Sequence, residues 1–146
     1  MVQIDRNGLE VLDRESCLRL LRTATLGRIA ITVGALSVIL PITFTMVDDQ
    51  IVFRTAPGTK LDAATQNAVV AFEVDDFDPL YHSGWSVAVT GVACEISDPS
   101  DAMIRTTPRW APGADGRVVA IPLDRVSGRR LDGGHVPVGA DIHDSG

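Results

Sequence analysis

The sequence predicts a mainly β domain in which six antiparallel strands form a small, closed or nearly closed barrel, connected by a few short helices. Three observations favour this fold class. The chain has 146 residues, the usual size of one domain, and 45% of them are hydrophobic, enough for a core. Runs rich in Val, Ile and Thr recur along it and are typical of strands. These runs do not alternate regularly with helices, so a parallel βαβ sheet is not expected.

The first expected element is a short helix capped by Asp13, with Leu18 and Leu21 on its apolar side and Gly27 at its end. The uncharged stretch 29–47 is long enough for a membrane span, but Gly34 and Pro41 interrupt it. It therefore predicts two buried strands joined by a turn. The six expected strands cover residues 28–33, 37–47, 50–55, 69–74, 85–97 and 117–126.

The connections between these strands carry turn and cap signals. Asp48-Asp49 predicts a tight turn, because short acidic side chains tolerate turn conformations. Ala56-Pro57-Gly58 ends the third strand, and a short helix is expected from Lys60. Asp98-Pro99-Ser100 opens another helical turn towards Arg105, and 107–116 is expected to be a loop. We expect one domain over residues 1–132 and a flexible C-terminal tail over residues 133–146.

Charge and targeting signals limit the classes of partner and compartment. The chain has 13 Lys and Arg against 19 Asp and Glu, a net charge of −6, and it lacks a basic block. We therefore expect neither nucleic acid nor an anionic membrane as a partner. The N-terminus lacks a secretion signal, which predicts a cytoplasmic protein. Cys17 and Cys94 are expected to be buried reduced thiols, although a disulfide between them stays open.

The segment from Phe53 to Asp62 has the features of a phosphate-binding site. A strand ends there, the chain turns, and a helix starts with Thr59 in capping position. Free amides at a helix start favour an anion, Arg54 and Lys60 add positive charge, and Thr55 and Thr59 add hydroxyl groups. The alternative is a solvated loop whose cations pair with Asp62 or Glu73.

A second informative segment begins at Gly84. Trp85 could wall a flat aromatic ligand while Ser86 donates a hydrogen bond to it. The alternative is that Trp85 plugs one end of the barrel. Gly91, inside the same strand, indicates a bulge or a close approach of another backbone.

The sequence contains no recognisable hydrolytic or metal site. The histidines, His82, His135 and His143, are scattered, and the acidic residues 75–78 are expected to form a solvated turn. An enzyme without such groups depends on its cofactor for the chemistry, although a non-catalytic protein fits equally well.

Several segments, taken together, resemble the pyridoxamine 5′-phosphate oxidase-like flavin-binding split-barrel family. The segments are Leu26-Gly27-Arg28-Ile29-Ala30, Leu40-Pro41-Ile42-Thr43-Phe44, Phe53-Arg54-Thr55 with Gly58-Thr59-Lys60, and Gly84-Trp85-Ser86-Val87 with Gly91. They cover about residues 10–130 in the family's order. The chain looks most similar to the short actinobacterial-type members, which also have an Ile-Pro-Leu strand followed by Gly128-Arg129-Arg130.

The resemblance implies an FMN-binding split barrel that forms a homodimer, with a cofactor cleft at each side of the interface. It assigns the FMN phosphate and ribityl chain to Arg54, Thr55, Thr59 and Lys60. It assigns the flavin ring to the strand residues Leu40, Pro41, Ile42 and Thr43. Trp85 and Ser86 match positions that face the cofactor from the other subunit, and Arg129 or Arg130 can reach the site.

The resemblance also narrows the expected activity. The oxidases of vitamin B6 end with a segment bearing Arg and His that binds the substrate phosphate, and this chain has Gly133-Gly134-His135 there. Relatives that confer nitroimidazole resistance have a His where this chain has Arg54. Neither activity is therefore expected.

The leading hypothesis is a flavin-dependent oxidoreductase that acts on a small organic substrate. The cofactor is expected to be FMN, with a deazaflavin or FAD as alternatives. A non-catalytic flavin or deazaflavin storage module is the alternative function. Haem binding, known among split-barrel relatives, is a weaker alternative because no well-placed axial His is visible.

Overall fold

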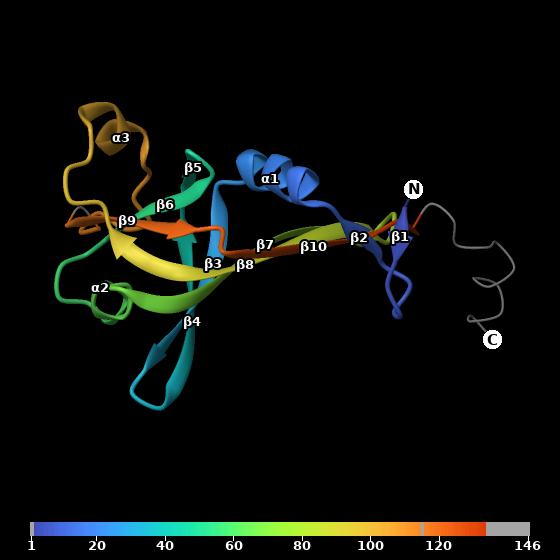
Figure 1. The fold of residues 1–146 in the computed structure, drawn as a ribbon, viewed down its shortest axis with the longest axis horizontal. Coiled ribbons are helices and arrows are strands. Elements are labelled where there is room, and N and C mark those ends of the chain that lie inside the picture. The colour runs from blue at the N-terminus through green and yellow to red at the C-terminus, as the bar shows by residue number, and fades with distance from the viewer. Residues whose placement is uncertain (1, 115, 134–146) are drawn as a thin grey trace, which may run out of the picture.

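The computed structural model describes residues 2–114 and 116–133, and it confirms the mainly β, antiparallel split-barrel class (Figure 1). The tail predicted over 133–146 lies outside these residues, apart from Gly133. The described elements, in chain order, are β1 (Gln3–Ile4), β2 (Glu10–Leu12), α1 (Arg14–Thr23), β3 (Leu26–Val33), β4 (Leu36–Thr43), β5 (Thr45–Val47), β6 (Gln50–Thr55), α2 (Lys60–Ala64), β7 (Ala68–Asp78), β8 (Ser83–Glu95), α3 (Asp101–Thr106), β9 (Arg117–Pro122) and β10 (Arg125–Leu131).

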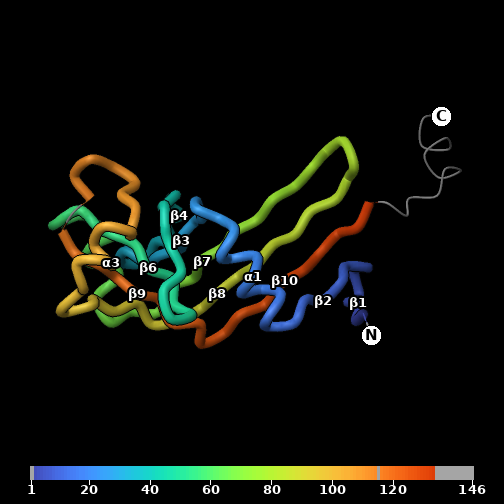
Figure 2. The backbone as a smooth tube through the Cα atoms, turned by 90° about the horizontal axis from the view of Figure 1, so that it is seen from above, coloured from blue at the N-terminus to red at the C-terminus, as the bar shows by residue number. Residues whose placement is uncertain are grey.

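One long strand, β8, joins the two halves of the sheet. The larger half has the order β1-β2-β10-β8-β7-β3-β4, and the smaller half consists of β5, β6 and β9. Most of β8 pairs with β7 and β10, whereas Cys94 and Glu95 at its end pair with β9. Figure 2 shows the β7–β8 hairpin extending from the barrel with β10 beside it.

The structure has ten strands rather than the six expected. The run 37–47 divides at Phe44, whose amide donates to Thr25 O at 3.0 Å instead of continuing the β3–β4 pairing. The run 117–126 divides after Pro122, where pairing with β6 ends, and the next strand, β10, lies between β8 and β2. The short β1 and β2 were not predicted, because pairing with other strands rather than local sequence defines them: β2 pairs with β10, and β1 pairs with β2.

The core lies between the two halves and is built around aromatic rings. Phe44, Phe53 and Phe72 are fully buried, and the rings of Phe44 and Phe72 meet edge to face with centroids 4.9 Å apart. Gly27 does not end the first helix as expected but lies inside β3. A side chain there would overlap the Phe72 ring, so the position needs glycine. Gly91 makes the expected close approach, to the Pro122 carbonyl.

The short connections follow the sequence signals closely. Asp13 caps α1 by accepting a hydrogen bond from Ser16 N at 2.8 Å. Asp48 and Asp49 form the predicted turn with positive φ values of 50° and 58°. No helix among the described residues is long and apolar enough to cross a membrane. Cys17 is buried, Cys94 is half-buried, and both are free thiols.

Candidate ligand-binding site

A cleft of about 470 Å³ opens at the end of the barrel that carries α2. Three segments line it: β4, the residues between β6 and α2 with the start of that helix, and the loop that follows α3. Its walls are mostly apolar, and Arg54 and Lys60 bring positive charge to them. This size and lining suit a small organic ligand with an anionic group.

The β4 wall contains three of the four residues predicted to meet a ring. Leu40, Pro41 and Ile42 line the cleft. Thr43 is absent from the lining, and its hydroxyl is buried without a hydrogen-bond partner among the described residues. Because β4 is the edge of the sheet and pairs only with β3, its outer backbone groups remain available to a ligand, except at Pro41, which has no amide hydrogen.

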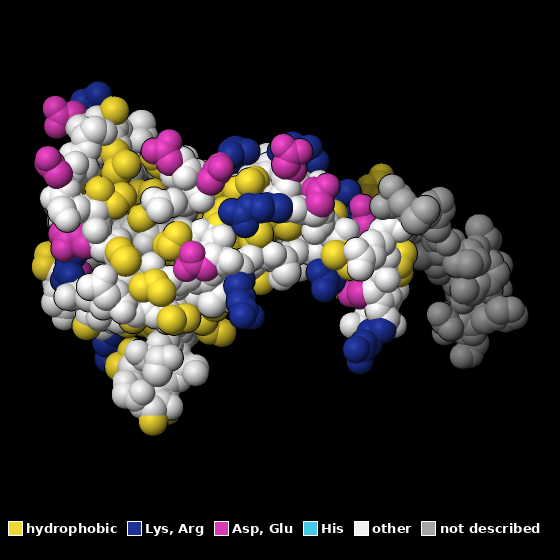
Figure 3. Space-filling model, in the orientation of Figure 1, with side chains coloured by type: hydrophobic (Ala, Val, Ile, Leu, Met, Phe, Trp, Pro, Cys, Tyr) yellow, Lys and Arg dark blue, Asp and Glu magenta, His cyan; other side chains and the backbone are white. Residues whose placement is uncertain are grey.

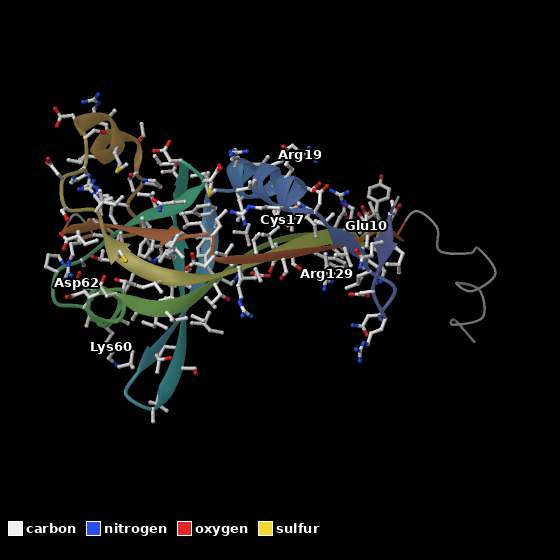
Figure 4. All side chains as sticks on the ribbon, in the orientation of Figure 1. Glu10, Cys17, Arg19, Lys60, Asp62 and Arg129 are labelled. Carbon is white, nitrogen blue, oxygen red and sulfur yellow. The ribbon has the colours of Figure 1, made fainter. Side chains whose placement is uncertain are left out.

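Lys60 stands at the start of α2 without an anionic partner. Within residues 2–114 and 116–133, no ion pair or side-chain hydrogen bond involves it. The carboxylates that the alternative interpretation required are engaged elsewhere, Asp62 with Arg117 at 2.6 Å and Glu73 with Arg28 at 3.5 Å. Lys60 therefore does not form the ion pair with Asp62 or Glu73 that the solvated-loop alternative assumed. Figure 4 shows Lys60 and Asp62 beside α2, with Lys60 turned away from the barrel.

Asp62 fixes the shape of this loop. It is only 5% exposed, and it accepts hydrogen bonds from Thr55 Oγ1 at 2.8 Å, Gly58 N at 3.1 Å and Arg117 Nη2 at 2.6 Å. Burial alone would raise the pKa of Asp62, but these hydrogen bonds and the charge of Arg117 outweigh it and lower the pKa below its ordinary value. A carboxylate is thus used to hold the loop rather than to neutralise Lys60.

The two predicted threonine donors have structural partners. Thr55 is fully buried, outside the cleft lining, and donates to Asp62. Thr59 lines the cleft, but its hydroxyl donates to Ala56 O at 2.8 Å and accepts from Asp62 N as the cap of α2. Since α2 has only five residues, its dipole is small. Attraction for an anion therefore comes mainly from the side chains of Arg54 and Lys60.

Trp85 and Ser86 do not meet the cleft within one chain. They border a separate hollow at the far side of the molecule, with Asp75, Asp76 and Arg129. Trp85 also packs partly against the core, in line with the barrel-plug alternative.

Arg129 and Arg130 lie at the same far end as Trp85. Arg129 pairs with Asp5 at 2.9 Å, and Arg130 with Glu10 at 3.9 Å. Figure 4 shows Arg129 and Glu10 at the opposite end from Lys60.

Trp110 was not predicted as a site residue from the sequence. It lines the cleft together with Ala111 and Ala114, all from the loop after α3. The only local signal was a large aromatic residue within a segment rich in Pro and Gly. No group of residues among those described could hold a metal ion.

The antiparallel split barrel, with its apolar, cation-bearing cleft, places the chain in the split-barrel class. Residues 13–130 match the sequence model of the family described as pyridoxamine 5′-phosphate oxidase. The chain belongs to this family, which confirms the resemblance.

Individual relatives agree with this assignment. An uncharacterized protein of Mycobacterium tuberculosis is 39% identical over 127 residues, covering 82% of this chain and 84% of that protein. The structure of an FAD binding protein from Mycobacterium smegmatis is similar with a TM-score of 0.69 and 36% identity, over 84% of this chain and 98% of that one. A conserved protein of unknown function from Corynebacterium diphtheriae has a TM-score of 0.67 and 30% identity, over 84% and 98%.

Proposed function

We propose that this protein is a flavin-dependent oxidoreductase that binds the cofactor in the cleft between β4 and α2 and acts on a small organic substrate. The observation that carries the proposal is the combination, in one cleft, of an apolar strand wall with two cations, Arg54 and Lys60. Of these, Lys60 forms no ion pair or side-chain hydrogen bond with the residues that the structure describes. A flavin nucleotide needs both the wall and the cations, because its ring is flat and largely apolar and its phosphate is anionic.

The donor set fits this ligand. Lys60 and Arg54 would neutralise the phosphate, and Leu40 and Ile42 would keep water from one side of the ring. The similarity to an FAD binding protein from Mycobacterium smegmatis supports a flavin. FMN is the smallest flavin with both the ring and the phosphate, and a deazaflavin or FAD would place the same groups in the same cleft. When bound, the flavin supplies the hydride or electron chemistry.

A second copy of the chain would complete the site, with residues 1–132 as the assembling domain. Part of the outer face of the sheet supports this, since an apolar row crosses neighbouring strands beside the charged group of Arg28, Glu73 and Asp75. Ile39, Ala30, Ala71 and Thr90 stand in one row across β4, β3, β7 and β8. Ile39 is 69% exposed. Ser86 lies on this same face of β8, so a partner docked here would bring its own Ser86 towards the cleft, whereas Trp85 points to the opposite face of the strand.

Purification of the full chain tests the proposal. We expect a yellow protein absorbing at about 450 nm, or uptake of added FMN or FAD by the colourless protein. A chain that takes up neither FMN, FAD nor a deazaflavin would contradict it.

Turnover separates an oxidoreductase from the storage-module alternative. A nicotinamide cofactor should reduce the bound flavin, and a small organic acceptor should then reoxidise it faster than buffer alone. Tight binding without reduction or acceptor-dependent reoxidation would favour storage.

A further inference from the structure

A second hollow, the arginine groove, lies where β8, β10 and the start of α1 meet. Its volume is about 630 Å³, and none of its lining residues lines the cleft between β4 and α2. Ala88 and Val126 form its apolar part, and its polar lining residues are Arg14, Thr90, Asp124, Arg125 and Ser127. The groove is therefore a candidate site separate from the cleft.

The pairing of β8 with β10 brings the groove residues of these two strands to one face of the sheet. Arg125 lies opposite Thr90, and Ser127 lies opposite Ala88. Because side chains two residues apart on a strand point to the same face, a guanidinium group and two hydroxyl groups stand close together there.

The second arginine comes from α1, across the edge of β10. The strand β2 pairs with β10 only at residues 128–130, so the preceding part of that edge has no neighbouring strand. Arg14 reaches this place, where its Nη1 donates to Leu123 O at 3.3 Å. One cation of the groove is thus held in position by the main chain.

Neither of these arginines has a carboxylate partner. Within the described part of the chain, Arg14 and Arg125 take part in no ion pair, although the protein has a net charge of −6. Asp124, the acidic residue that lines the groove, instead accepts a hydrogen bond from Val92 N at 3.4 Å. The arginines that do pair with carboxylates are Arg22, Arg28, Arg117, Arg129 and Arg130.

The hydroxyl groups of the groove are equally available. Thr90 is half-buried and Ser127 is exposed, and neither has a hydrogen-bond partner among the residues that the structure describes. Two guanidinium groups and two hydroxyl groups can all donate hydrogen bonds. Such a donor set matches the oxygens of a phosphate group, which the planar fork of an arginine binds in pairs.

We propose that the arginine groove binds a small organic phosphate. The phosphate lies between Arg14 and Arg125, and the organic part rests on Ala88 and Val126. Thr90 also ends the row on which a second copy is proposed to dock, so the groove opens at the margin of that face. This site goes beyond the proposed function, because it needs no flavin.

Titration of the full chain with phenyl phosphate, followed through the backbone amide signals in NMR spectra, tests the proposal. Saturable shifts are expected at Thr90, Arg125 and Ser127. Arg125→Gln should raise the dissociation constant at least about fivefold, because it removes a charge-assisted hydrogen bond made by an exposed side chain. Arg14→Gln should raise it as well. Benzoate, which has a single negative charge, should bind more weakly than phenyl phosphate.

The matched control is Arg105→Gln, which removes the same charge from an exposed residue of α3 outside the groove. It should leave the dissociation constant unchanged, and so should Lys60→Ala, which alters only the cleft. The proposal is overturned if the groove amides do not shift, if Arg105→Gln weakens binding as much as Arg125→Gln, or if benzoate binds as tightly as phenyl phosphate. A chain that binds phenyl phosphate in the groove but takes up no flavin would contradict the proposed function alone.

Discussion

At the scale of single residues, Lys60 is the side chain on which phosphate binding depends most directly. Because it has no partner among the described residues, its replacement should leave the fold intact. We expect Lys60→Ala to weaken FMN binding about 10- to 150-fold, which is about 1.5–3 kcal/mol for a charge-assisted hydrogen bond. Titration with riboflavin, which lacks the phosphate, is the control and should give the same affinity in both proteins. An unchanged affinity for FMN would place the phosphate elsewhere.

Asp62, unlike Lys60, is expected to support the loop rather than to contact the ligand, because it is buried and does not line the cleft. Asp62→Asn keeps an acceptor for Thr55 but removes the charge that faces Arg117. We expect the free energy of unfolding in urea to fall by roughly 1.5–3 kcal/mol. Asp49→Asn is the matched control, because Asp49 and Arg22 form an ion pair whose side chains are both about half exposed. It should cost less than about 1 kcal/mol. Equal decreases in the free energy of unfolding of the two variants would show that the contacts of Asp62 do not stabilise the loop more than an exposed ion pair does.

Glu73 predicts a dependence of stability on pH. Burial, together with the hydrogen bond and negative charge of Asp75, raises the pKa of Glu73 to about 7, although Arg28 opposes the shift. The folded chain therefore holds a proton that the unfolded chain releases above its ordinary pKa of 4.5. The stabilisation of the folded chain by this proton is complete below pH 4.5 and is lost as the pH rises towards 7. Thermal unfolding at several pH values should show a smaller decline over that range for Glu73→Gln, and parallel curves for the two proteins would contradict the prediction.

At the scale of elements, the contact between β3 and β7 depends on the absence of a side chain at Gly27. Gly27→Ala would push a methyl group into the Phe72 ring, which is fully packed. We expect a loss of about 1–3 kcal/mol in the free energy of unfolding, the usual cost of overpacking a core. Gly113→Ala is the control, since a methyl group there meets open space. A neutral Gly27→Ala would mean that β3 and β7 can separate at little cost.

The local sequence predicted the ends of elements correctly where nearby side chains determine the turn or the cap. The turn at Asp48-Asp49 and the start of α2 at Lys60 were predicted because side chains near those positions set the backbone there. The break at Phe44 was not, because it depends on a hydrogen bond to Thr25 from another element.

The same distinction applies to the cleft. Arg54 and Lys60 were found because one short segment carries both. Trp110 was missed because it reaches them only through the pairing of β6 with β9, where Thr55 meets Arg117. Sequence spacing carries no information about that approach.

At the scale of the whole molecule, the proposed homodimer predicts that assembly and cofactor binding are lost together. Ile39→Asp places a charge on the outer face of the sheet without touching the core, because Ile39 is mostly exposed. Sedimentation should show a dimer for the wild type and a monomer for the variant, whose flavin affinity should fall at least about tenfold. Ile104→Asp, an exposed change on α3, should leave both unchanged. A monomeric wild type that binds flavin fully would contradict the dimer.

On the face of the molecule that Figure 3 shows, acidic and basic side chains are interspersed rather than gathered by sign.

The sharing of β8 between both halves of the sheet has a consequence for how the molecule comes apart. Without β8, β7 and β10 lose the strand between them and β9 loses its pairing with the larger half, so we expect the two halves to unfold together. The two tryptophans, Trp85 and Trp110, are natural reporters at remote points of the structure. Emission from single-tryptophan variants should therefore trace superimposable denaturation curves.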